Sequence, residues 1–134
     1  MMILHLDTHV LVWLYAGEPE RFSSRAQAAL DHSHLMYSPI VELELLYLFE
    51  IGRITVPAGD ILSYLEARIG VAPDQTSYSS VVKESGGLSW TRDPFDRLIV
   101  GAAMAGQHPL LTRDREIRRN CRLAFWDDSD SAGV

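Results

Sequence analysis

The chain has 134 residues, 47% of them apolar and 22% charged, which is enough for one domain with a buried core. No apolar run approaches the ~20 residues of a membrane-spanning helix, the N-terminus lacks the features of a signal peptide, and the lone Cys121 excludes an internal disulfide and a cysteine-based zinc site. We therefore expect a cytoplasmic protein, whose net charge of −6 argues at first against nucleic-acid partners.

Short apolar segments alternate with longer amphipathic ones along the chain. Strands are expected at residues 3–6, 35–38, 71–72, 110–112 and 123–126. Helices are expected at residues 8–15, 23–31, 39–51, 60–69, 78–84, 93–105 and 113–118. This alternation predicts a mainly parallel sheet covered by helices on both faces, with ligands at the carboxyl ends of the strands. It leaves the order of the strands open.

The chain reads as a single unit without repeats or an internal linker. We expect one domain over residues 1–126, followed by an acidic, flexible tail at residues 127–134.

Four carboxylates occupy positions where a folded chain has little structural need for them. They lie at strand ends, at a helix start or on an apolar helix face, and they are Asp7, Glu44, Asp96 and Asp114. Burying isolated carboxylates costs several kcal/mol or more, and convergence on a hard divalent cation such as Mg²⁺ or Mn²⁺ would compensate for that cost.

Asp7 follows a predicted strand and precedes a predicted helix, and Asp114 follows a predicted strand and lies in the first turn of the next predicted helix. Either residue could therefore be a helix N-cap or a metal ligand at the sheet edge. Thr8 adjoins Asp7 and would support it as a ligand through its hydroxyl group. Either Thr112 or Asp114 could cap the short helix. Glu116 is a weaker fifth acid.

Glu44 has apolar or aromatic residues at all four helical neighbour positions, i±3 and i±4. It therefore points away from solvent, and we favour it over Glu42, whose surroundings resemble the rim of a buried face. The helix that carries both is apolar nearly all round, which indicates a second buried face such as a subunit interface.

The segment Asp93-Pro94-Phe95-Asp96 is a helix-start signature. Asp93 is best explained as the N-cap. Asp96 shares its face with Ile99 and Val100, so it points inward, and we favour it as the metal ligand of this segment.

Eleven of the twelve basic residues are arginines, and several flank these acids. Arginine suits bidentate phosphate contacts, so the overall negative charge does not exclude a nuclease. The candidates for RNA phosphate contacts are Arg92, Arg97, Arg113 and Arg115. The alternative is a solvated helix face with salt bridges.

Four blocks in order resemble the PIN-domain ribonucleases and, among these, the VapC-type toxins of bacterial toxin–antitoxin pairs. The blocks are Leu4-His5-Leu6-Asp7-Thr8-His9, Glu44-Leu45-Leu46-Tyr47 with Gly52-Arg53-Ile54, Arg92-Asp93-Pro94-Phe95-Asp96-Arg97, and Leu111-Thr112-Arg113-Asp114. Asp96 ranks above Asp93 here because it directly precedes the Leu-Ile-x-x-Ala run that the family places after its ligand. Glu50 departs from the family, which often has a Lys or Arg there.

The resemblance implies a three-layer α/β/α sandwich with a central, mainly parallel sheet. It also implies a Mg²⁺-dependent endoribonuclease toxin with acidic ligands at Asp7, Glu44, Asp96 and Asp114, and with Thr112 beside them. A homodimer inhibited by a small antitoxin, whose segment occupies the active-site groove, is the expected assembly.

Two alternatives stay open at this point. A catalytically silent binding module would keep the scaffold and the metal but cut no RNA. A phospho-aspartyl phosphoryl-transfer domain would use Asp7 as its nucleophile, and it is disfavoured because no Asp-x-Asp pair follows the first strand and Lys83 is the sole lysine.

Overall fold

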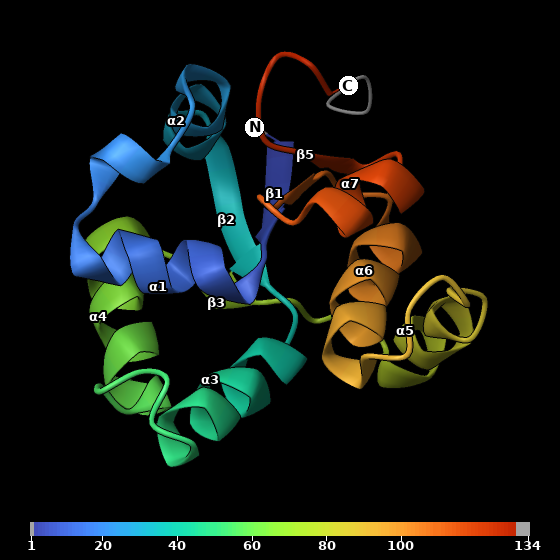
Figure 1. Cartoon of the computed structure of the whole chain (residues 1–134), viewed down its shortest axis with the longest axis horizontal. Coiled ribbons are helices and arrows are strands. Elements are labelled where there is room, and N and C mark those ends of the chain that lie inside the picture. Colours follow the sequence, from blue (N-terminus) through green and yellow to red (C-terminus); the bar gives the residue numbers. More distant parts are fainter. Residues whose placement is uncertain (1, 131–134) are drawn as a thin grey trace.

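The computed structural model describes residues 2–130, which form one parallel sheet with helices on both faces (Figure 1). The strands are β1 (Met2–Leu6), β2 (Ser33–Tyr37), β3 (Ala72–Pro73), β4 (Leu110–Leu111) and β5 (Ala124–Phe125). The helices are α1 (Thr8–Ala16), α2 (Ser24–Asp31), α3 (Ile40–Glu50), α4 (Ala58–Ile69), α5 (Tyr78–Ser85), α6 (Pro94–Gly106), α7 (Arg115–Asn120) and the short 3-10 helix η1 (Pro19–Arg21). The predicted alternation is confirmed, and η1 is the element that the sequence analysis did not expect.

The strand order is β3-β2-β1-β4-β5, and every pair in the sheet is parallel. The first strand lies at the centre, where His5 is opposite Met36 of β2 and Leu110 of β4. Both faces of β1 are covered, so Leu4 and Leu6 on one face and His5 on the other are almost completely buried. The end of β1 therefore delivers Asp7 to the middle of the carboxyl edge.

Helices cover the sheet in two layers (Figure 1). Helices α1 and α4 lie against each other on one side, and α5 and α6 pack together on the other side. Helix α3 contacts both α4 and α6, and so it closes the molecule below the carboxyl ends of the strands. The expected α/β/α sandwich is confirmed.

Helix α3 buries only a narrow stripe of its apolar surface. Val41 and Leu45 are fully buried in the core. Its large apolar residues on the surface are Leu43, Leu46, Tyr47 and Phe49, and Ile51 follows directly after the helix. Within residues 2–130, none of the helices combines the length and apolarity that crossing a bilayer requires.

The chain end folds back onto the domain as far as Asp130. The Asp130 carboxylate accepts hydrogen bonds from the backbone N–H groups of Trp126 (2.7 Å) and Asp127 (3.0 Å) and from the Arg118 guanidinium (3.1 Å). Residues 131–134, which complete the tail predicted to be flexible, lie outside the described residues.

Candidate active site

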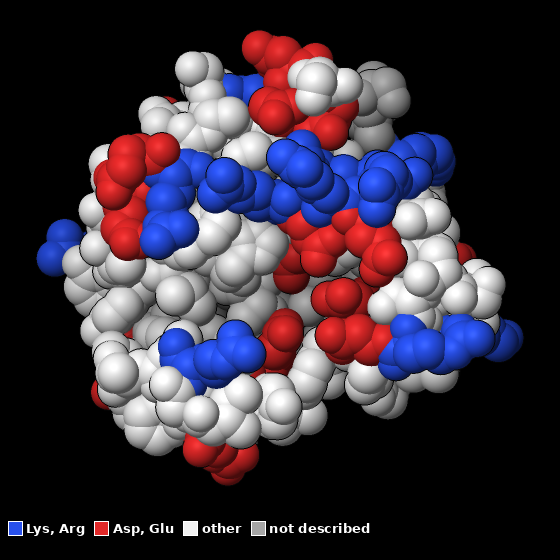
Figure 2. All heavy atoms as spheres, in the orientation of Figure 1, with Lys and Arg blue, Asp and Glu red and all other residues white. Residues whose placement is uncertain are grey.

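A cavity of about 530 Å³ opens where α1, α3 and α6 approach the carboxyl end of the sheet. Its polar lining residues are Asp7, Thr8, His9, Glu44, Arg53, Asp93, Asp96 and Asp114. Its apolar lining residues are Val12, Trp13, Leu48 and Ile54. Figure 2 shows a cluster of Asp and Glu side chains beside a hollow on this face, with a band of Lys and Arg side chains running along one side. The structure thus brings together all four carboxylates that the sequence analysis selected.

Asp7 is held firmly at the end of β1. It caps α1, since its Oδ1 accepts a hydrogen bond from the Thr8 backbone N–H at 2.8 Å, and its Oδ2 accepts one from the Thr112 hydroxyl at 2.7 Å. The same Thr112 oxygen accepts a hydrogen bond from the backbone N–H of Asp114 at 3.0 Å. A fully buried threonine therefore links the acids that follow two neighbouring strands.

Asp114 also caps a helix. Its Oδ1 accepts hydrogen bonds from the backbone N–H groups of Glu116 (2.9 Å) and Ile117 (3.0 Å) at the start of α7. The exposed Glu116 does not line the cavity.

Glu44 reaches the cavity from the middle of α3. Its Oε1 accepts a hydrogen bond from the Thr8 hydroxyl at 2.5 Å, which ties α3 to the start of α1. Burial raises the pKa of Glu44, the Thr8 hydrogen bond opposes this, and the charges of Asp7 and Asp93 raise the pKa further. Glu42 is exposed and lies beside another cavity, so the helical geometry selected the residue that points inward.

Asp93 and Asp96 enter from the first turn of α6. Asp93 is the N-cap, since its Oδ1 accepts hydrogen bonds from the N–H groups of Phe95 (2.8 Å) and Asp96 (3.4 Å). Burial raises the pKa of Asp96 to about 7, helped by the charges of four carboxylates, which are those of Asp7, Asp93, Asp114 and Glu44. In the part of the chain that the structure describes, no hydrogen bond is formed to the Asp96 carboxylate. Asp96 is thus the acid of the cavity that most needs a positive charge nearby.

The donor set fits a hard divalent cation in its chemistry. Carboxylate and threonine oxygens dominate the polar lining, and mutual repulsion among the acids raises the pKa of Asp96. Among residues 2–130, no three His, Cys, Asp or Glu side chains are close enough as they stand to hold one ion together. The lining therefore fits a cation by the chemistry of its oxygen atoms, while the predicted set of four acidic ligands is not assembled around a single point. Mg²⁺ often binds through one or two carboxylates and completes its coordination with water.

Three further residues of the cavity were not singled out from the sequence. His9 accepts a hydrogen bond at Nε2 from the backbone N–H of Arg113 (3.0 Å), and its Nδ1 lies 3.6 Å from Asp7 Oδ2. The Trp13 ring lies beside the His9 ring, tilted by 53° to it, with ring centres 4.8 Å apart. The exposed Arg53 lies on the segment after α3. A sequence signal exists for two of them, because His9 and Trp13 lie one helical turn apart on the face of α1 that also carries Thr8 and Val12.

The four arginines predicted to contact RNA surround the cavity without lining it. Arg92 and Arg97 donate to the backbone carbonyls of Ser89 (3.1 Å) and Thr91 (2.8 Å) before α6. Arg115 is exposed at the start of α7. The Arg113 guanidinium lies 5.8 Å from the centre of the Trp13 ring.

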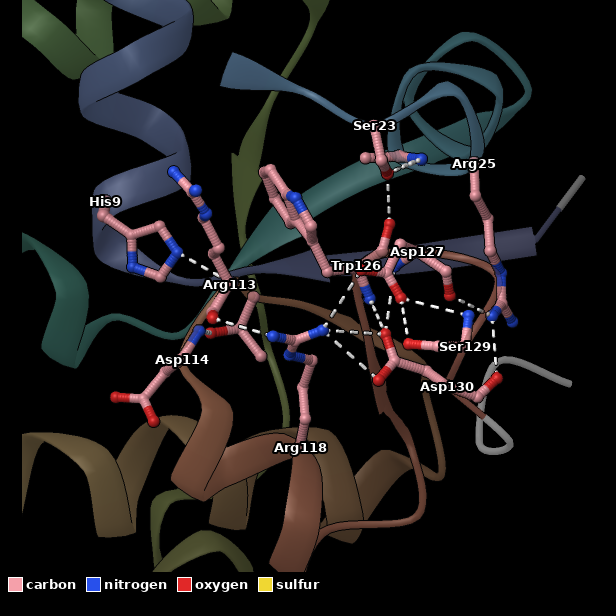
Figure 3. A network of polar contacts seen from close by, with 12 residues as sticks. His9, Ser23, Arg25, Arg113, Asp114, Arg118, Trp126, Asp127, Ser129 and Asp130 are labelled. Atoms are coloured by element: carbon pink, nitrogen blue, oxygen red, sulfur yellow. Dashed lines mark hydrogen bonds and ion pairs between the residues drawn. The ribbon is translucent and has the colours of Figure 1, made fainter.

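The loop between Thr112 and Asp114 is braced from the side of the chain end (Figure 3). Arg118 donates from Nη2 to the Arg113 carbonyl at 3.3 Å and from Nη1 to Asp130. Ser23 at the start of α2 donates to the Trp126 carbonyl. These contacts, together with the His9 bond, hold the backbone that positions Asp114.

The family model of the PIN domain matches residues 4–123, which is most of the chain. The chain belongs to the PIN-domain family. Among curated proteins it is similar to "Ribonuclease VapC22" of Mycobacterium tuberculosis (strain ATCC 25618 / H37Rv), with 32% identity over 125 residues that cover 88% of this chain and 92% of the relative. The expected family membership is thereby confirmed. The word ribonuclease in that name describes the activity of the relative.

Solved structures of VapBC proteins share the fold of this PIN domain. One is VapBC2 from Rickettsia felis bound to a DNA fragment from its promoter, with a TM-score of 0.66, 18% identity and coverage of 94% of this chain and 98% of that chain. Another is DNA-bound VapBC from Salmonella typhimurium, with a TM-score of 0.62, 22% identity and coverage of 95% and 98%. At these identities the likeness concerns the fold.

Proposed function

We propose that this PIN domain is a Mg²⁺-dependent endoribonuclease toxin that hydrolyses RNA phosphodiesters and is neutralised by a small antitoxin. The observation that carries the proposal is the convergence of Asp7, Glu44, Asp96 and Asp114 from four different parts of the chain on one cavity. Membership of the PIN-domain family and similarity to a VapC ribonuclease support the same reading.

Asp7, Asp96 and Asp114 would hold one or two Mg²⁺ or Mn²⁺ ions, with Glu44 binding directly or through water. A bound Mg²⁺ would neutralise phosphate charge, lower the pKa of an attacking water and stabilise the leaving oxygen. In the overall reaction, water attacks phosphorus, the bond to the leaving oxygen breaks, and that oxygen takes up a proton.

The chain itself supplies position and charge. Thr112 and the Thr8 backbone N–H fix both oxygens of Asp7, and the Thr8 hydroxyl fixes Glu44. Asp114 uses Oδ1 for capping α7, which leaves Oδ2 for the cation. The Asp96 carboxylate can turn toward a bound cation, because the described residues form no hydrogen bond that fixes its orientation.

Arginines around the cavity would hold the phosphates that flank the cut bond. Arg53 lines the cavity directly, and Arg92, Arg97, Arg113 and Arg115 lie around it. The binding of RNA to an acidic site should therefore depend on both the cation and the arginines, and it should weaken as salt increases.

An antitoxin partner and a homodimer complete the proposal. The solved structures that share this fold are of VapBC proteins, which supports a partner protein for this chain. The exposed apolar residues of α3 support burial of that helix face against a second copy.

The decisive experiment is the cleavage of total RNA with about 5 mM Mg²⁺, a scale suited to weakly held Mg²⁺. Wild type is compared with Asp7→Asn, Asp96→Asn, an EDTA-treated sample and the matched control Glu42→Gln, which changes an exposed acid on α3. We expect discrete fragments from wild type and Glu42→Gln, and their loss from the other samples. Mapping the fragment ends would give the target.

The two alternatives predict other outcomes of the same experiment. Mg²⁺ binding by well-folded, antitoxin-free wild type without cleavage of tRNA, rRNA or mRNA would favour the silent binding module. A covalent phosphate on Asp7 would favour the phosphoryl-transfer domain.

A further inference from the structure

The cavity has a second wall whose chemistry a cation and a phosphate do not explain. Val12, Trp13, Leu48 and Ile54 line it, and all four are half-buried. Metal ions and phosphates bind through polar groups. The apolar wall therefore has the composition of a site for a flat, apolar part of a ligand.

Two helices that line the cavity change from polar to apolar lining residues along their length. On α1, Thr8 is followed one turn later by Val12, and His9 by Trp13; on α3, Glu44 is followed one turn later by Leu48. One turn separates the two kinds of lining by about 6 Å along each helix. A phosphate held among the acids would thus leave the base of its own nucleotide within reach of the apolar wall.

Trp13 is the part of this wall best suited to stacking. Its ring is braced by edge contacts with Phe22 (6.2 Å between ring centres) and Trp126 (5.9 Å). The guanidinium groups of Arg21 and Arg113 lie 5.0 and 5.8 Å from its ring centre, so planar, delocalised groups already lie over the indole. Arg113 is exposed and can move aside toward a phosphate.

We propose that this wall is a nucleobase subsite, in which the nucleotide next to the cut bond places its base against Trp13 and between Leu48 and Ile54. Arg53 and Arg113 then contact the flanking phosphates. The proposal rests on the ribonuclease function proposed above.

Nucleotide binding tests the subsite without requiring cleavage. Protein labelled with ¹⁵N and held in millimolar Mg²⁺ is titrated with AMP, GMP, CMP, UMP and ribose 5-phosphate, and the indole N–H signals of Trp13, Trp90 and Trp126 are followed. Mg²⁺ alone gives the baseline, and Trp13→Phe assigns the signal. We expect nucleotides to shift the Trp13 signal and to bind about tenfold more tightly than ribose 5-phosphate. Equal binding of ribose 5-phosphate, or an unmoved Trp13 signal, would overturn the proposal.

Kinetics then separate stacking from packing. On a short unpaired RNA around the mapped cut, Trp13→Ala and Leu48→Ala should raise KM by about tenfold with a smaller change in kcat. Phe22→Leu is the matched control, because Phe22 touches Trp13 but does not line the cavity. Removing the base next to the cut should weaken the binding of RNA to wild type clearly more than its binding to Trp13→Ala, because the variant has already lost part of the contact with the base. Additive effects, or an equal loss in Phe22→Leu, would refute the subsite.

The two proposals fail in different ways. Nucleotide binding at Trp13 without any RNA cleavage would keep the subsite and remove the nuclease. Cleavage of RNA with no dependence on the base would keep the nuclease and remove the subsite.

Discussion

Asp96 is the side chain of the cavity whose negative charge the fold supports least. Burial raises its pKa to about 7, and the neighbouring carboxylates add to this effect. The folded protein therefore binds more protons at Asp96 than the unfolded chain does between about pH 4 and pH 7, so this residue lowers stability as the pH rises through that window. A bound divalent cation would reverse the effect.

Replacing Asp96 should remove the loss of stability that its negative charge causes at higher pH. We expect Asp96→Asn to raise the melting temperature of the metal-free protein by a few degrees at about pH 8 and to have little effect near pH 4, because asparagine carries no charge. Thermal melts in EDTA across this pH range measure the difference. Asp60→Asn, which changes an exposed acid in the first turn of α4, is the control. A difference from wild type that does not vary with pH would contradict the explanation.

His5, in the core of the sheet, lowers the stability of the folded protein as the pH falls, whereas Asp96 lowers it as the pH rises. It is 1% exposed, and burial lowers its pKa to about 4, although Asp74, whose Oδ1 lies 3.5 Å away, opposes the shift. The folded protein therefore keeps His5 neutral where the unfolded chain protonates it. Its contribution to stability is full above about pH 6.5 and is lost as the pH falls toward 4.

His5→Leu should remove this pH dependence, whatever its constant effect on packing. The stability of wild type relative to the variant should fall by about 3 kcal/mol at most between pH 6.5 and pH 4, because the lower pKa of the folded state no longer matters once the histidine is gone. Urea denaturation at several pH values gives the two curves. Parallel curves would show that His5 does not titrate as described.

At the scale of elements, α5 and α6 approach each other through a residue without a side chain. A Cβ atom at Gly101 of α6 would lie 2.1 Å from Ser85 Oγ and 2.9 Å from the Val81 carbonyl of α5. Ser85 already donates hydrogen bonds to the carbonyls of Val81 (2.7 Å) and Arg97 (2.9 Å), so it has little freedom to move. This contact holds the helix that carries Asp96 against its layer.

Gly101→Ala should therefore destabilise the protein by about 1–3 kcal/mol, the usual range for overpacking in a core. Chemical denaturation measures the change. Gly59→Ala is the matched control, since a Cβ there meets open space on α4, and it should be neutral or slightly stabilising. Equal effects of the two substitutions would indicate that helix propensity, and not the contact, decides the outcome.

Element starts were readable from the sequence because capping is local. Asp7, Asp93 and Asp114 each bind backbone N–H groups within the next three residues. The sequence favoured this role for Asp93 and left it open for Asp7 and Asp114. The same locality hides function, because a cap and a cation ligand place aspartate at the same position. The element η1 was missed because a single 3-10 turn has too few residues to show a periodic pattern.

At the scale of the whole molecule, α3 and the residue after it gather five exposed large apolar side chains on one element, which is the composition of an interface. The homodimer proposed above would bury them. We expect wild type to have the mass of a dimer in light scattering and Leu46→Glu to have that of a monomer, because a charge in an apolar interface is costly to bury. Val82→Glu, which changes a similarly exposed residue on α5, should remain dimeric. A monomeric wild type, or dissociation by both changes, would exclude α3 as the interface.

The sequence by itself determined the kinds and the order of all the strands and α-helices, the N-cap Asp93 and the inward direction of Glu44. All of these follow from interactions within a few residues or from helical periodicity. Only the tertiary structure decided that β1 lies between β2 and β4, that Thr112 binds Asp7, and that Arg53 and Trp13 complete the cavity. These facts depend on contacts between segments far apart in the chain, since strand pairing and helix packing, unlike capping, leave no short-range pattern in the residues that they join.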